Sequence, residues 1–200
     1  VHIHPRGTFY TMPMVGSYVG GDITAGILAA GMHHADELAL LLDIGTNGEV
    51  VVGNKEFMVA CSASAGPAFE GARISMGMRA ATGAISEVHV RDGAFHCHVL
   101  GNVTPRGICG SGLVDAVASG LDLGLVLPTG RLAANQEWML EAPVSLTQWD
   151  IRELQLAKGA IRSGQEILML EAGIQASDIQ AFIVAGAFGT YLDLGSAITI

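Results

Sequence analysis

A short turn with the residue types of a phosphate site lies at residues 43–48, which read Asp-Ile-Gly-Thr-Asn-Gly. Gly45 and Gly48 allow positive φ and let backbone N–H groups approach a ligand closely. Thr46 and Asn47 add short polar groups. Because convergent N–H groups form an anion-binding concavity, this candidate phosphate turn can bind phosphate oxygens.

The carboxylate of Asp43 ends the apolar run that precedes the turn. It is the candidate catalytic residue, and it could hold Mg²⁺ through water because Mg²⁺ dehydrates reluctantly. An ordinary β-hairpin with a tight glycine turn has the same pattern, so this segment alone leaves both interpretations open.

Two further glycine-rich turns strengthen the nucleotide interpretation. The helix-entry turn, residues 107–112, opens a predicted helix and would expose free N–H groups and the positive end of the helix dipole. The strand-exit turn, residues 186–189, follows a predicted strand and could lie against an adenine or ribose face. For the helix-entry turn, the alternative is that its glycines only permit close packing. For the strand-exit turn, the alternative is a plain strand-to-helix connection. The candidate nucleotide contacts in these turns are Gly110, Ser111, Gly112, Gly186, Ala187 and Gly189.

Composition excludes several classes of protein. The 200 residues are 50% hydrophobic and 14% charged, which predicts one domain or two tightly packed subdomains with a sizeable core. A net charge of −9 argues against nucleic acid and anionic membrane partners. There is no apolar run of about 18 residues and no secretory signal peptide.

The three cysteines, Cys61, Cys97 and Cys109, fit neither a metal site nor a disulfide framework, which favours a cytoplasmic location. His96 and His98 share one strand face without an identifiable third ligand, so we expect solvent-exposed histidines. The chain begins without Met, and its last residues have the pattern of a helix that has just begun, so we expect a fragment of a longer protein.

The elements that position these residues follow from the apolar pattern. The first half predicts a helix capped by Asp22 and ending at Gly31, a hairpin over 38–53, a third strand over 56–60, and a loop of small residues over 61–71. The second half predicts a hairpin over 84–91 and 94–100, a helix from the helix-entry turn to about 122, a mostly irregular region over 125–146, and a strand over 181–185.

A long helix is predicted between Thr147 and Gly173. Thr147 and Asp150 form a variant capping box, and Gly173 is a C-terminal stop. Gly159 and Gly164 each cost roughly 1 kcal/mol relative to Ala, which predicts that another element packs closely there.

Several motifs together resemble the ATPase domain of reductive activators of corrinoid proteins, a family of the acetate and sugar kinase, Hsp70 and actin superfamily. The motifs are Asp43–Glu49, Ala60–Gly71, Gly107–Leu113, Asp150–Lys158 and Ala185–Gly189, and they occur in the expected order between about Ser17 and Ile200.

The resemblance implies an α/β fold, actin-like and ribonuclease H-like, with mixed sheets flanked by helices in two subdomains around a nucleotide cleft. It assigns phosphate binding to Asp43, Gly45, Thr46 and Gly48, and adenosine binding to Gly186, Ala187 and Gly189. Such proteins use ATP and Mg²⁺ to let a low-potential electron from a [2Fe–2S] domain return a Co(II) corrinoid protein to Co(I) for methyl transfer.

The sequence departs from the whole family pattern in two respects. It has no cluster-binding cysteine run and no upstream Asp-Ile-Gly-Thr copy. Residues 1–200 are therefore interpreted as the second half of an actin-like ATPase domain, without the [2Fe–2S] domain. Alone, this chain is expected to bind ATP weakly and to be inactive.

The implied partner is a corrinoid protein. Small residues in the loop over 61–71 would allow close approach of a planar cofactor, and the hydroxyl of Ser62 or Ser64 could approach the cobalt; alternatively, these serines cap the following segment. A small-molecule kinase of the same superfamily and a non-catalytic actin-like scaffold remain alternatives, and the oligomeric state, including a homodimer, is open.

Overall fold

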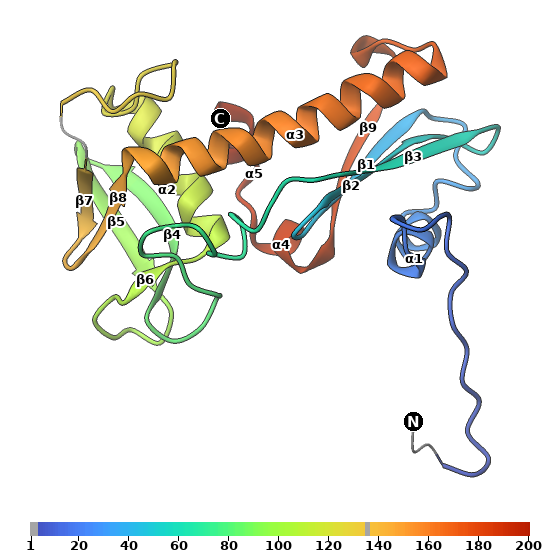
Figure 1. Cartoon of the computed structure of the whole chain (residues 1–200), viewed down its shortest axis with the longest axis horizontal. Coiled ribbons are helices and arrows are strands. Elements are labelled where there is room, and N and C mark those ends of the chain that lie inside the picture. The colour runs from blue at the N-terminus through green and yellow to red at the C-terminus, as the bar shows by residue number, and fades with distance from the viewer. Residues whose placement is uncertain (1–3, 135–136) are drawn as a thin grey trace.

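The computed structural model describes residues 4–134 and 137–200, and these form two lobes joined by one long helix (Figure 1). The predictions about residues 1–3, and about 135 and 136 within the 125–146 region, lie outside the described residues.

The first lobe is built on a mixed sheet of four strands in the order β3-β2-β1-β9. The strands are β1 (Ala39–Ile44), β2 (Gly48–Gly53), β3 (Met58–Ala63) and β9 (Ala181–Ala185). Strands β1, β2 and β3 pair antiparallel, whereas β9 joins β1 in parallel after a long excursion of the chain through the second lobe. Helix α1 (Gly21–Ala29) belongs to this lobe.

Both faces of this sheet are buried, which explains the continuous apolar run in β1. Leu40 and Leu42 face the main core, while Leu41 faces a smaller core that includes Ile23 of α1. Because successive side chains of a strand point to opposite faces, Asp43 lies on the same face as Leu41.

The second lobe contains a three-stranded sheet, a buried helix and a hairpin. The sheet has the order β5-β4-β6, with β4 (Ala84–Arg91), β5 (Ala94–Val99) and β6 (Gly107–Ile108). Helix α2 (Gly110–Asp122) packs on β4, and β7 (Glu137–Glu141) pairs with β8 (Val144–Thr147).

The joining helix, α3 (Gln148–Ala172), confirms the capping prediction at both ends. The Asp150 backbone N–H donates to the Thr147 hydroxyl at 3.3 Å, and the Thr147 N–H donates to the Asp150 carboxylate at 2.7 Å. Gly173 adopts the left-handed conformation with φ 67°. After α3 come a 3₁₀ turn (Ala176–Asp178), β9, α4 (Gly186–Tyr191) and α5 (Leu194–Thr199).

The two helix glycines differ in their surroundings. A Cβ on Gly164 would lie 3.2 Å from the Ala63 Cβ and 3.3 Å from the Cys61 sulfur, so close packing on β3 is confirmed there. At Gly159 the expectation is wrong, because no described atom outside its own helix turn lies within 4 Å of such a Cβ.

Three other element predictions need correction. Helix α1 has Gly20 as its N-cap, and Asp22 lies inside the first turn, where a carboxylate still interacts favourably with the helix dipole. Strand β3 continues through Cys61–Ala63, which was predicted as loop, because these residues pair with β2.

The third correction concerns the region over 125–146, which contains the β7–β8 hairpin. Trp138 of β7 packs on Phe95 with ring centroids 5.0 Å apart, and this tertiary contact outweighs the local turn signals. The hairpins over 38–53 and 84–100, the helix to 122 and the strand over 181–185 are confirmed.

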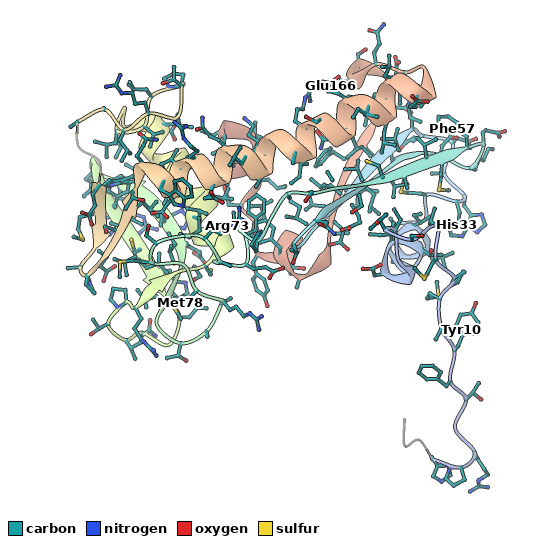
Figure 2. All side chains as sticks on the ribbon, in the orientation of Figure 1. Tyr10, His33, Phe57, Arg73, Met78 and Glu166 are labelled. Atoms are coloured by element: carbon teal, nitrogen blue, oxygen red, sulfur yellow. The ribbon has the colours of Figure 1, made fainter. Side chains whose placement is uncertain are left out.

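The N-terminal segment, residues 4–11, extends away from both lobes, and Tyr10 on it is 76% exposed (Figure 2). No helix in the described part of the chain has the length and apolar character needed to cross a membrane.

Candidate functional site

A row of polar side chains crosses the first sheet at the end of β1. Asp43 of β1 lies opposite Glu49 of β2, and Glu49 lies opposite Ser62 of β3. The Ser62 hydroxyl donates a hydrogen bond to the Glu49 carboxylate at 2.8 Å. The sheet register therefore places two carboxylates and a hydroxyl side by side on the face that also carries α1.

The environment of Asp43 disfavours its negative charge. Burial raises the pKa of its carboxyl group, and the nearby carboxylates of Asp22 and Glu49 raise the pKa further. A cation beside Asp43 would relieve this repulsion, so the donor set fits a magnesium ion. Among the described residues, no group of three His, Cys, Asp or Glu side chains converges as a set of metal ligands.

The strand-exit turn touches Asp43 directly. Strand β9 pairs with β1 so that Ala185 is the neighbour of Asp43, and Gly186 follows with φ 79°. A Cβ on Gly186 would lie 2.3 Å from a carboxylate oxygen of Asp43. Only glycine fits here, and two of the three glycine-rich turns meet at this carboxylate.

The candidate phosphate turn is a tight reversal between β1 and β2. The Gly45 N–H donates to the Asn47 carbonyl at 2.8 Å, and the side chains of Thr46 and Asn47 are exposed. Gly48 instead serves packing, because a Cβ there would lie 2.7 Å from Ile161 of α3. The Thr46 hydroxyl donates a hydrogen bond to the carboxylate of Glu70.

An aromatic pair brings the third turn to the same region. Phe69 precedes Glu70, and its ring centroid lies 5.0 Å from that of Phe188 in α4. A Cβ on Gly110 would lie 2.2 Å from the Phe69 carbonyl and 2.8 Å from the Phe188 ring. The structure thus gathers segments of all three turns around Phe69 and Phe188.

The helix-entry turn is nevertheless buried. A Cβ on Gly112 would lie 2.4 Å from the Ile85 carbonyl, and the Ser111 hydroxyl donates to the Ser86 carbonyl at 2.8 Å. These contacts favour close packing for Gly110, Ser111 and Gly112 and leave Ser111 engaged with β4.

The two serines considered for partner binding border a hollow of about 580 Å³. This serine hollow is lined by Gly16, Ser17, Tyr18, Val19, Asn47, Ala60, Cys61, Ser62 and Ser64. Asn47 connects it to the candidate phosphate turn, so the turn and the serines share one surface.

Two carboxylates of this region, Glu49 and Glu70, were missed by sequence reasoning. Glu49 could have been found, because Asp43 and Glu49 stand equally far from the centre of the turn and must face each other across a regular hairpin. No local signal pointed to Glu70, whose partner Thr46 is 24 positions away in sequence.

The expected solvent exposure of His96 and His98 is confirmed. His96 and His98 are exposed, and His98 contacts Glu87, whose pKa is lowered by hydrogen bonds to His89 and His98. All three cysteines are free, and burial raises the pKa of the Cys97 thiol to about 11.

Comparison with known proteins gives a consistent result. Residues 37–200 match a family model described as "C-terminal domain of RACo the ASKHA domain", and residues 1–35 match one described as "RACo middle region". The chain is 38% identical to the corrinoid activation enzyme RamQ of Eubacterium limosum, covering 98% of this chain and 37% of that protein. It is 30% identical to a [Co(II) methylated amine-specific corrinoid protein] reductase of Methanosarcina barkeri, covering 92% of this chain and 38% of that protein.

A solved structure of a reductive activator for corrinoid, iron-sulfur protein superposes with a TM-score of 0.86 at 40% identity. The alignment covers 96% of this chain and 34% of that one. The chain therefore spans little more than a third of the length of the relatives it matches. The expected actin-like α/β fold is confirmed by these matches.

Proposed function

Because this chain belongs to the family of reductive activators of corrinoid proteins, we propose that it is the nucleotide- and partner-binding portion of such an activator. The proposed whole protein uses ATP to return an inactive Co(II) corrinoid protein to Co(I). The electron would come from a [2Fe–2S] domain elsewhere in the protein, since this sequence has no cluster-binding cysteine run.

The nucleotide site is proposed at the meeting point of Asp43 and Gly186. The observation that carries this proposal is the direct contact between the carboxylate and the glycine, which joins the candidate phosphate turn to the strand-exit turn. The proposed contacts of the phosphates are Gly45, Thr46, Asn47 and Gly48, and those of the adenosine are Gly186, Ala187 and Gly189. Gly110, Ser111 and Gly112 would contribute only through their backbone, because they are buried.

The chemistry proposed for these residues is electrostatic. Asp43 would hold Mg²⁺ through water, and the metal would neutralise charge on the transferred phosphoryl group. The N–H groups of the turn would orient the phosphate oxygens, and the two lobes would limit access of water. The raised pKa of Asp43 fits this role, because binding of the cation compensates the repulsion from Asp22 and Glu49.

The partner is proposed to be a corrinoid protein that contacts the serine hollow. Ser64 is exposed there, and Ser62 donates its proton to Glu49, which leaves the lone pairs of its oxygen free to approach a metal. A homodimer and a cytoplasmic location remain predictions from the sequence.

The central test is Asp43→Ala in the full-length protein, measured as steady-state Mg²⁺-dependent ATP hydrolysis. We expect at least a 100-fold loss, since the charge that binds the metal is removed, with circular dichroism unchanged. Asp36→Ala is the control, because Asp36 is 84% exposed and pairs with Lys55 away from the turn. Unchanged turnover in Asp43→Ala would refute the site. A phosphorylated small-molecule product would favour the kinase alternative, and nucleotide-dependent filaments the scaffold.

The partner surface is tested separately with Ser62→Ala and Ser64→Ala in the full-length protein. We expect weaker binding of a Co(II) corrinoid protein and a changed visible spectrum of the complex, with ATP affinity nearly constant. Ser163→Ala on the exposed side of α3 is the control, since the Ser163 hydroxyl donates to the Gly159 carbonyl of its own helix. Wild-type spectra and affinity in both variants would show that these serines are structural.

A further inference from the structure

The hydroxyl of Thr46 belongs to an exposed side chain of the candidate phosphate turn, and it is already engaged. It donates its single proton to the carboxylate of Glu70. Thr46 lies between β1 and β2 of the first lobe, whereas Glu70 lies in the connecting segment, residues 64–75, that leads toward the second lobe. This side-chain hydrogen bond therefore ties the turn to the connection between the lobes.

A bound phosphate would need the same proton. An ionised carboxylate and a phosphate oxygen are both acceptors only, and a hydroxyl has one proton to donate. The two anions would also repel each other across Thr46. Resting on the nucleotide site proposed above, we propose that Glu70 competes with the bound phosphate for the Thr46 hydroxyl. Glu70 is then a positioning residue. Without nucleotide its carboxylate holds the Thr46 hydroxyl, and it releases that hydroxyl when nucleotide binds.

The consequences of releasing Glu70 follow from the contacts of its neighbours. The Glu70 N–H donates to the Pro67 carbonyl at 3.2 Å and the Gly71 N–H to the Ala68 carbonyl at 3.0 Å, so residues 67–71 form one compact turn. Phe69 in this turn packs on Phe188, two residues after Gly186. Displacement of Glu70 therefore acts on the contact between the connecting segment and the strand-exit turn.

The connecting segment also borders the proposed partner surface. It begins at Ser64, which lines the serine hollow, and it continues to Arg73, whose guanidinium lies 3.8 Å from the Glu153 carboxylate of α3. Figure 2 shows Arg73 between the lobes and Met78 in the second lobe. The state of the Thr46–Glu70 bond would thus report nucleotide occupancy to the surface where the corrinoid protein is proposed to bind.

The test measures ATP affinity of the full-length protein by calorimetry in the presence of Mg²⁺. Glu70→Gln keeps an acceptor but removes the charge, so ATP should bind about three- to fivefold more tightly, the range of exposed charge interactions. Thr46→Val removes the contested hydroxyl and should weaken binding severalfold. In the Thr46→Val background, Glu70→Gln should have a smaller effect than it has alone, since the competition no longer exists.

Glu56→Gln is the matched control, because Glu56 is an exposed carboxylate in the β2–β3 turn of the same lobe. The Glu56→Gln protein should bind ATP with the same affinity as the wild-type protein. Unchanged or weaker ATP binding in Glu70→Gln overturns the competition, and so does an equal effect in both backgrounds. These results leave the nucleotide site standing if the wild-type protein binds ATP and Asp43→Ala does not hydrolyse it. Failure of the wild-type protein to bind ATP overturns both proposals.

Discussion

The candidate phosphate turn and the helix-entry turn are both rich in glycine, yet they differ in what surrounds them. At the first, the side chains of Thr46 and Asn47 are exposed, the Thr46 hydroxyl donates to Glu70, and Gly186 lies beside Asp43. At the second, Gly110 packs so closely on the Phe69 carbonyl, and Gly112 on the Ile85 carbonyl, that neither position has room for a Cβ. The first turn keeps its polar side chains at the surface, whereas the second uses its glycines for close approach of backbone.

The difference shows that glycine content alone does not mark a ligand site. Glycine is selected both where a ligand needs space and where another chain segment already fills that space. The two roles of glycine can be told apart only when the surroundings of the turn are known. Substitutions at the two turns should therefore have different effects.

The largest effect is expected for Gly112→Ala. The new Cβ would lie 2.4 Å from the Ile85 carbonyl, and a backbone atom cannot move aside cheaply. Overpacking of this kind costs about 2–3 kcal/mol, which lowers the melting temperature by roughly 5–10 °C. Thermal unfolding followed by circular dichroism measures it, and a melting temperature within 1 °C of wild type, to about the precision of the method, would contradict the packing role.

Gly159→Ala provides the contrasting helix glycine and a smaller effect of opposite sign. In the described structure a Cβ at this position meets open space, so the substitution gains helix propensity without a clash. The gain is about 0.5–1 kcal/mol, or roughly 2–3 °C in melting temperature. A loss of stability would indicate an undetected contact on this side of α3.

The smallest effect concerns Asp43 in the exposed turn. Because its pKa is raised in the folded protein, its ionised form costs stability, and this cost appears as pH rises from the ordinary value of 3.8 through the folded pKa. Without nucleotide or Mg²⁺, Asp43→Asn should therefore melt about 1–2 °C higher than wild type at pH 7, after solvent screening is allowed for.

The same difference should shrink as pH falls toward 4, because a growing fraction of the wild-type carboxyl becomes protonated. Asp36→Asn is the control, since Asp36 is exposed and remote from the carboxylate row. A difference between Asp43→Asn and wild type that stays constant from pH 7 to pH 4 would show that electrostatic repulsion is not its cause.

Local patterns were sufficient for much of the fold. The capping box of Thr147 and Asp150, the glycine stop at Gly173 and the hairpin over 38–53 depend on neighbours in sequence, and all three are present. The β7–β8 hairpin escaped prediction because Trp138 finds its partner Phe95 more than 40 residues away.

The same distinction applies to the candidate site. The residue types of the candidate phosphate turn identified it as a region of interest, but the contact of Asp43 with Gly186 required the parallel pairing of β1 with β9. The Thr46–Glu70 bond and the burial of Ser111 likewise depend on how distant segments meet. Sequence reasoning proposed the groups, and tertiary packing decides which of them face one another.

The long helix α3 has a mechanical consequence for the two lobes. Its 25 residues, about 37 Å, are anchored by Asp150, which accepts the Ser75 N–H at 2.6 Å, and by Ile161 against Gly48. The lobes are also connected by residues 64–75, which form no helix or strand, and by the segment after β9, whose helix α5 packs on α2 of the second lobe. Because α3 is one continuous helix, we expect a turn of one lobe against the other to change the irregular segment that carries Glu70 more than the helix itself (Figure 1).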